Sequence, residues 1–110
     1  MDHALSESRF EALADETLGR LMEQLADLES DRLEVDLESG VLTMSFDDGV
    51  RYVINSHRAA RQIWMAADAT AWHFDWVESR WLSAKTGEEL FGVVQARTSQ
   101  KLGQTVSIHR

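Results

Sequence analysis

Apolar residues recur every three or four positions near the start of the chain. The series begins at Phe10 and ends at Leu28, and this spacing lays one apolar stripe along a helix of several turns. Ser8 has Glu11 three residues further on, which is the spacing of a capping box at a helix start. The pattern therefore predicts a first helix over residues 8–28.

Strict alternation replaces this spacing after the helix. In Leu33–Glu38 every second residue is apolar and the others are acidic, which predicts a strand with one buried and one wet face. Five more segments rich in β-branched and aromatic residues follow, and the turn Asp47-Asp48-Gly49 is a strong hairpin signal. Residues 56–60 are predicted to form a loop. The predicted strands are 33–38, 41–46, 50–55, 62–66, 71–77 and 80–83.

A second helical stripe lies near the end of the chain. It begins at Leu90 and stops at Gly103, and Thr86 with Glu89 again has the spacing of a capping box. The order helix, about six strands, helix, with tight turns between the strands, indicates an α+β fold. We expect a single domain over residues 1–110, a two-layer sandwich in which both helices pack on one face of a single antiparallel sheet.

The uncovered face of such a sheet makes one tryptophan a candidate for binding. Ile63 and Met65 have the spacing of core positions, so Gln62 and Trp64 share the outer face. An exposed tryptophan beside a glutamine is typical of a binding hot spot. A tryptophan at such a position also stiffens a sheet through cross-strand pairs, and both interpretations stand. His73 is predicted to point outward into solvent.

Composition excludes several classes of protein. The hydrophobic content of 44% and the charged content of 27% are typical of a globular chain. Because the chain has no cysteine, it offers no thiolate zinc site, no cysteine-ligated cluster of its own and no thiol nucleophile. It has no common catalytic motif, so we expect that it is not an enzyme. We also expect no membrane span and no signal peptide, and a cytoplasmic location fits.

Negative charge is concentrated in the first third of the chain. Residues 1–38 hold twelve Asp and Glu against three Arg, a net charge of −9, whereas residues 39–110 hold seven acids and eight bases, a net charge of +1. A chain with a net charge of −8 is poorly suited to grip nucleic acid. The one-sided field favours cations or a basic partner surface, although acidic surface also serves solubility. Self-repulsion predicts a monomer in the absence of metal.

Two like-charge pairs lie one turn apart on the predicted first helix. Glu11 with Asp15, and Glu23 with Asp27, are four residues apart, and each pair costs a few tenths of a kcal/mol in a free helix. A bound cation or a basic partner would relieve this repulsion. Carboxylates alone suit hard cations such as Mg²⁺, Ca²⁺, Mn²⁺ or iron. Exposed carboxylates on a rigid helix cannot wrap an ion, so binding is expected to be weak and partly hydrated.

Several short motifs follow one another along nearly the whole chain. They include Val53-Ile54-Asn55, Gln62-Ile63-Trp64-Met65-Ala66, Trp72-His73-Phe74-Asp75 and Thr86-Gly87-Glu88. In order and spacing they resemble the frataxin family, most closely its bacterial CyaY members. The chain departs from the family pattern at Ser56-His57-Arg58-Ala59, where relatives carry a basic residue, a glutamine and a proline.

The resemblance implies a frataxin-like fold and a role in iron–sulfur cluster assembly. It implies weakly and reversibly bound Fe²⁺ or Fe³⁺, contacts with a cysteine desulfurase and a scaffold protein, and room for iron-dependent oligomers. Two hypotheses remain open: an iron carrier, and a regulatory interaction module for which iron binding is secondary. A ferroxidase is disfavoured because the sequence has no di-iron motif of the Glu and Glu-x-x-His type.

By position, the resemblance assigns an acidic ridge and a sheet-face contact surface. The ridge consists of Glu7, Glu11, Asp15, Glu23, Asp27, Glu29, Asp31, Glu34 and Asp36. The iron ligands predicted within it are Glu11, Asp15, Glu23, Asp27, Asp31, Glu34 and Asp36. The predicted partner contacts are Glu23, Asp27, Glu29, Asn55, Gln62, Trp64 and His73.

Overall fold

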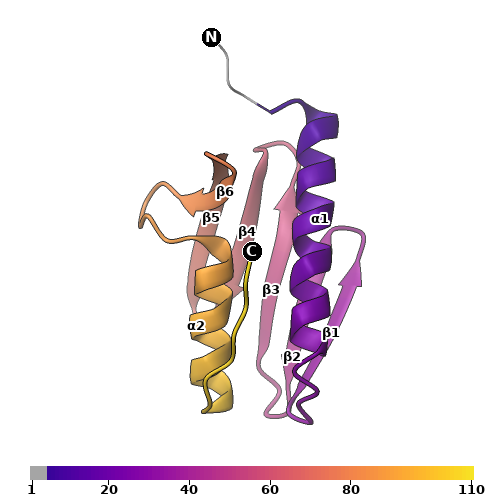
Figure 1. The fold of residues 1–110 in the computed structure, drawn as a ribbon, viewed down its shortest axis with the longest axis vertical. Helices are drawn as coiled ribbons and strands as arrows, with labels where there is room; N and C mark the ends of the chain where they lie inside the picture. Colours follow the sequence, from indigo (N-terminus) through magenta and orange to yellow (C-terminus); the bar gives the residue numbers. More distant parts are fainter. Residues whose placement is uncertain (1–4) are drawn as a thin grey trace.

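The computed structural model describes residues 5–110 and contains one six-stranded antiparallel sheet with two helices (Figure 1). The strands are hydrogen-bonded in sequence order, β1-β2-β3-β4-β5-β6. None of the helices in the described range is long and apolar enough to cross a membrane. The elements are α1 (Glu7–Ala26), β1 (Leu33–Glu38), β2 (Val41–Phe46), β3 (Arg51–His57), β4 (Gln62–Ala67), β5 (Thr70–Val77), β6 (Arg80–Ser83) and α2 (Leu90–Leu102).

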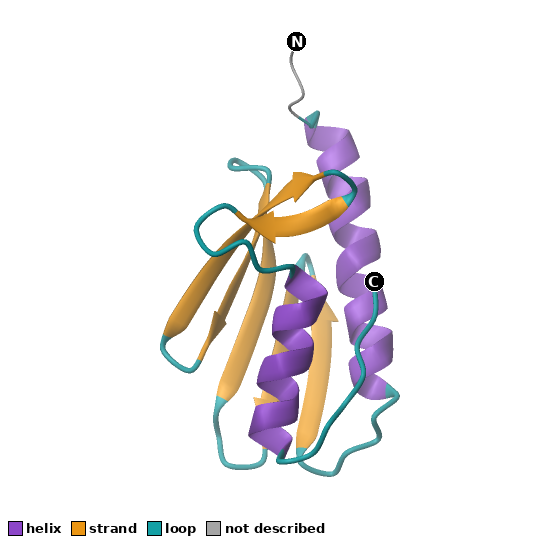
Figure 2. Cartoon of the chain, turned by 60° about the vertical axis from the view of Figure 1, so that its left-hand side comes forward, coloured by secondary structure: helices purple, strands orange, loops and turns teal. Residues whose placement is uncertain are grey.

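Both helices lie on the same face of the sheet, as Figures 1 and 2 show from two directions. The apolar stripes of the helices and the inward residues of the strands form the core, in which Phe10, Ile54 and Phe74 are almost completely buried. In β1 the inward side chains are shielded while the acidic ones are exposed, as alternation predicts. The predicted two-layer sandwich is therefore confirmed, and its outer sheet face carries no helix of the described chain.

A buried hydrogen-bonded pair joins the first helix to the last strand. The Trp81 indole N–H donates to Thr17 Oγ1 at 2.9 Å, and the Thr17 hydroxyl donates to the Leu13 carbonyl at 2.8 Å. The Phe10 ring meets Trp81 edge-on, with centroids 5.9 Å apart. Because each polar group has a partner, the core tolerates both without an unsatisfied donor.

The first helix begins one residue before the predicted start, because its cap is Ser6 and not Ser8. The Ser6 side chain accepts the Arg9 N–H at 3.1 Å, and Ser8 lies inside the helix. Leu5 precedes the cap and packs against the core, and Phe10 is the fourth helical residue, which is the spacing of a hydrophobic staple. That staple fixes the start of the helix. The helix ends at Ala26, two residues before the predicted end.

The second helix also begins differently from the prediction. Its cap is Glu89, whose carboxylate accepts the N–H groups of Phe91 and Gly92, so the predicted capping box starting at Thr86 does not form. The Thr86 hydroxyl accepts the Glu88 N–H within the preceding turn. The predicted end is confirmed, because Gly103 closes the helix with a left-handed backbone, at a φ of 72°.

The sheet extends into the segment predicted to be a loop. Ser56 pairs with Ile63 and His57 with Gln62, so β3 continues to His57 and the turn to β4 contains residues 58–61. The loop prediction was thus wrong for Ser56 and His57. Pairing with the well-defined strand β4 outweighs the polar character of these two residues, as strand propensity depends on cross-strand contacts.

The last residues of the chain run back between the two helices (Figures 1 and 2). Val106 and Ile108 are buried there. The Gln24 side-chain amide donates to the His109 carbonyl at 2.6 Å and accepts the His109 N–H at 2.7 Å. This segment is neither helix nor strand, so no hydrophobic periodicity in the sequence predicts its position.

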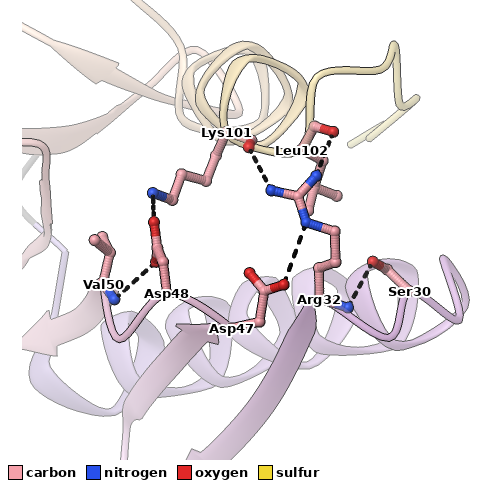
Figure 3. Close-up of polar contacts among 7 residues, drawn as sticks. All are labelled: Ser30, Arg32, Asp47, Asp48, Val50, Lys101 and Leu102. Carbon is pink, nitrogen blue, oxygen red and sulfur yellow. Dashed lines mark hydrogen bonds and ion pairs between the residues drawn. The ribbon is translucent and has the colours of Figure 1, made fainter.

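A polar network ties the end of α2 to the start of β1 and to the β2–β3 turn (Figure 3). The Arg32 guanidinium donates to the Leu102 carbonyl at 2.9 Å and lies 3.5 Å from the Asp47 carboxylate. The Lys101 ammonium pairs with Asp48, and this hydrogen bond holds the pKa of Asp48 below its ordinary value. Positive side chains near the end of a helix also complement its negative pole.

Candidate functional site

The acidic edge of the molecule is formed by the exposed carboxylates of α1, of the α1–β1 connection and of β1. Strand β1 is one of the two edge strands of the sheet and packs beside α1. Four of the predicted ridge residues line one open hollow of about 640 Å³ where α1 ends and β1 begins. Those four are Glu29, Asp31, Glu34 and Asp36. The sequence therefore identifies a set of acids that the fold brings to one place.

The geometry of these acids does not amount to a preformed chelating site. Among residues 5–110 no three Asp, Glu or His side chains lie close enough together to hold one metal ion. The carboxylates act on a cation mainly as a shared negative field. An ion at this edge would keep most of its water, because each carboxylate stands in solvent.

The other end of the ridge already holds a positive charge of the protein itself. Arg58, in the β3–β4 turn, lies 2.8 Å from a Glu11 carboxylate oxygen and 3.3 Å from one of Glu7. Together with Asp15, Glu11 and Arg58 line a second hollow. Arg58 thus relieves the repulsion between two predicted ridge residues, and sequence analysis missed it because the pairing depends on tertiary structure.

On the outer face of the sheet the Trp64 indole lies between two imidazole rings. The His57 ring centroid is 3.8 Å from that of Trp64 with 16° between the planes, and the His73 centroid is 4.2 Å away with 12°. The indole N–H donates to Gln62 Oε1 at 2.8 Å, and the Gln62 amide donates to Asp75 at 2.9 Å. We call His57, Trp64 and His73 the aromatic stack.

The structure brings the predicted sheet-face residues together. Asn55 is the cross-strand partner of Trp64 in β3, and His73 is its partner in β5. Trp64 is outward and half-buried, with Ile63 and Met65 buried behind it, as the alternation predicts. His57 was not predicted, because the segment that carries it was expected to be a loop.

One row of residues links the acidic edge to the aromatic stack. The strand register places Glu38 of β1 opposite Val41, Val41 opposite Asn55, and Asn55 opposite Trp64. Val41 is among the few large apolar residues exposed in the described chain, at 39%. Neighbouring strands are about 4.8 Å apart, so the backbones of Glu38 and Trp64 are roughly 14 Å apart. The exposed carboxylates of β1 therefore share one continuous sheet face with the aromatic stack, whereas the carboxylates of α1 lie on the helix side of the sheet.

Comparison with known proteins identifies the family. A family model described as a frataxin-like domain matches residues 3–104. The chain belongs to the frataxin-like family. A relative from Ralstonia nicotianae (strain ATCC BAA-1114 / GMI1000), named iron-sulfur cluster assembly protein CyaY, is 40% identical over 101 aligned residues, and the match covers 88% of this chain and 88% of that one.

Solved frataxin structures share the same fold. The frataxin from Psychromonas ingrahamii, of the CyaY protein family, superimposes with a TM-score of 0.89 at 22% identity, over 96% of this chain and all of that one. A trimeric frataxin from the yeast Saccharomyces cerevisiae, solved in complex with ferrous, has a TM-score of 0.74 at 26% identity, over 94% of this chain and 92% of that one. The fold implied by the sequence motifs is thus confirmed.

Proposed function

We propose that this chain acts in iron–sulfur cluster assembly, where it docks on a cysteine desulfurase and its scaffold protein and binds iron along its acidic edge. Membership of the frataxin-like family and similarity to a CyaY iron-sulfur cluster assembly protein support a role in this pathway. The observation that carries the docking proposal is the single uncovered face that joins the acidic edge to the aromatic stack.

The acidic edge and the uncovered sheet face beside it suit different contacts. The acidic edge, with Glu23, Asp27 and Glu29 among its predicted contacts, suits a basic surface, which it would attract from a distance. Asn55, Gln62 and Trp64 offer a compact polar and aromatic patch, the kind of centre that dominates binding energy in interfaces. We assign the edge to the desulfurase and the patch to the scaffold protein.

For iron, we propose weak and reversible binding by exposed carboxylates. The hollow at the junction of α1 and β1 offers only oxygen ligands, which suit a hard cation. That a yeast frataxin was solved with ferrous supports iron as the cation. We propose that Asp31, Glu34 and Asp36 bind the ion in the hollow. The two like-charge pairs on α1, Glu11 with Asp15 and Glu23 with Asp27, would attract it through their negative charge. We also propose that this chain forms oligomers when iron binds, and the trimeric yeast frataxin solved with ferrous supports this.

A second candidate function is a regulatory module for the desulfurase, with iron binding secondary. Two observations favour it. The described residues contain no group of three potential metal ligands, and Glu7 and Glu11 are already paired with Arg58. Both observations weaken iron binding and leave docking untouched.

Binding assays with charge-reversed variants test the proposal. Glu23→Lys should weaken the affinity for a purified bacterial cysteine desulfurase at least tenfold, an effect of about 1.4 kcal/mol. The matched control is Glu78→Lys, which makes the same charge change in the exposed β5–β6 turn. Trp64→Ala should weaken scaffold binding and leave Fe²⁺ binding unchanged. Equal desulfurase affinities for the two lysine variants would contradict the proposed docking edge.

A further inference from the structure

We infer that His57 and His73 are positioning residues for Trp64: they hold the indole upright so that only its apolar ring edge meets a partner, and a positive charge on either imidazole weakens docking of that partner. The inference rests on the proposed docking function. It goes beyond that function because it names what fixes the contact residue, what chemistry the contact has, and how pH controls it.

The geometry of the stack defines what a partner can touch. Both faces of the indole are covered, by His57 at 3.8 Å and by His73 at 4.2 Å between ring centroids. The indole N–H is used as well, because it donates to Gln62. No free π face and no free donor remain, so a partner contacts the carbon edge of the ring. The matching surface is an apolar side chain or shallow apolar pocket, and a stacking ring or guanidinium does not fit.

Strand register explains how the stack forms. His73 lies directly opposite Trp64, while His57 lies opposite Gln62 and reaches Trp64 along the diagonal. Diagonal neighbours on one sheet face are within reach of aromatic side chains. The stack therefore depends on the extension of β3 to His57, at the segment where the chain departs from the family pattern.

A hydrogen bond makes the stack sensitive to the charge of His57. The Ala60 N–H in the β3–β4 turn donates to His57 Nδ1 at 3.3 Å. Nδ1 can accept only while it carries no proton, so this bond requires neutral His57 with its proton on Nε2. Protonation of Nδ1 therefore breaks this hydrogen bond between His57 and the turn.

The charged groups around the two imidazoles differ. The turn that follows His57 carries Arg58 and Arg61, and Arg58 is paired with Glu7 and Glu11 of α1. On the other side, Asp75 of β5 and Lys85 of the β6–α2 connection line the same groove as His73. Asn55 and Gln62 are the other polar residues beside the stack, and both are uncharged.

Acidification therefore changes the proposed docking face in a defined direction. Histidine side chains gain their charge between pH 8 and pH 5. An imidazolium over an indole is attracted to it, but a partner that covers a charged ring must strip its water, and this costs free energy. We expect docking to be weaker at pH 6 than at pH 8, and we expect the environment of the Trp64 indole to change over the same range.

The indole N–H signals in an NMR spectrum of ¹⁵N-labelled protein test the inference directly. Trp64→Phe identifies the Trp64 signal among those of the four tryptophans. We expect this signal to move between pH 8 and pH 5.5, and His57→Ala to move it at pH 8. His57→Phe keeps a flat ring against the indole and cannot be protonated, so it should restore the signal. The double variant His57→Phe, His73→Phe should abolish the pH-dependent movement.

Docking on purified cysteine desulfurase with its scaffold protein supplies the second readout. His57→Ala should weaken docking about two- to tenfold at pH 8, since ordering one side chain has an effect of that size. His57→Phe should restore it and remove the loss at pH 6. The inference would be overturned if His57→Ala left the position of the Trp64 indole signal unchanged, or if the pH-dependent movement of that signal persisted in the double Phe variant. Docking unaffected by Trp64→Ala would instead overturn the proposed docking surface, because the NMR arm needs no partner.

Discussion

Replacing Arg58 with glutamine should strengthen cation binding at the N-terminal end of the acidic ridge. In the structure the Arg58 guanidinium pairs with Glu11 at 2.8 Å and with Glu7 at 3.3 Å. A cation that uses these carboxylates has to displace the guanidinium first. Arg58→Gln removes this competitor from Glu7 and Glu11.

The magnitude follows from the exposure of the pair. The side chains are 64% exposed for Arg58, 44% for Glu11 and 52% for Glu7, so solvent screens both contacts. Exposed ion pairs contribute about 0.2–1 kcal/mol each, so displacement of Arg58 costs a cation about 1 kcal/mol. This corresponds to a roughly fivefold lower dissociation constant in the variant, an effect that should shrink as salt is added.

Anaerobic Fe²⁺ titration followed by amide NMR around Glu11 measures the change. Arg51→Gln is the matched control, because it removes the same charge from the opposite end of β3, where Arg51 is exposed. A dissociation constant equal to that of the wild type, or an equal change in both variants, would contradict this prediction. The first result would mean that iron does not use these carboxylates, and the second that only net charge matters.

Three further predictions concern the fold that supports the site. Thr17→Val removes the acceptor of the buried Trp81 indole N–H, and urea unfolding should show a loss of about 1–3 kcal/mol, with a smaller loss for Thr17→Ser, which keeps the hydroxyl. The pKa of Asp48 is lowered from 3.8 by its hydrogen bond with Lys101, so its stabilisation is present above that value and is lost as pH falls through the lowered value. Lys101→Met should therefore reduce the loss of stability below pH 4 in acid unfolding monitored by circular dichroism. Ile108→Ala removes a buried side chain from the last segment, and calorimetry should show a destabilisation near the low end of the 2–5 kcal/mol usual for such changes, because the segment can relax.

Local periodicity predicted the elements of the fold well where each element faces one core. The alternation in Leu33–Glu38 and the positions around Trp64 needed only the two-residue repeat, and both were confirmed. The helix starts were less accurate, since several side chains near a helix start can serve as the cap. At the first helix Leu5 decides in favour of Ser6 by packing against the core, which is a signal the sequence does carry.

The parts of the site that sequence analysis missed all depend on contacts between distant segments. Arg58 meets Glu11 across 47 positions of sequence, and neither residue has a pattern that requires the other. His57 belongs to a segment without apolar alternation, so only pairing with β4 shows that it lies on the sheet. The final segment is held by the Gln24 amide on α1, a contact without periodicity. Local sequence patterns predict which face of a helix or strand is buried, but they do not predict which distant segments come into contact.

We propose that the acidic edge and the uncovered sheet face beside it, as far as the aromatic stack, receive the partner. The most direct test is an amide NMR map of the labelled protein with and without purified cysteine desulfurase and its scaffold protein. We expect signal loss along Glu23 and Asp27 of α1 and along the row from Glu38 to Trp64, with α2 unaffected. Signal loss centred on α2, or spread evenly over the molecule, would contradict it.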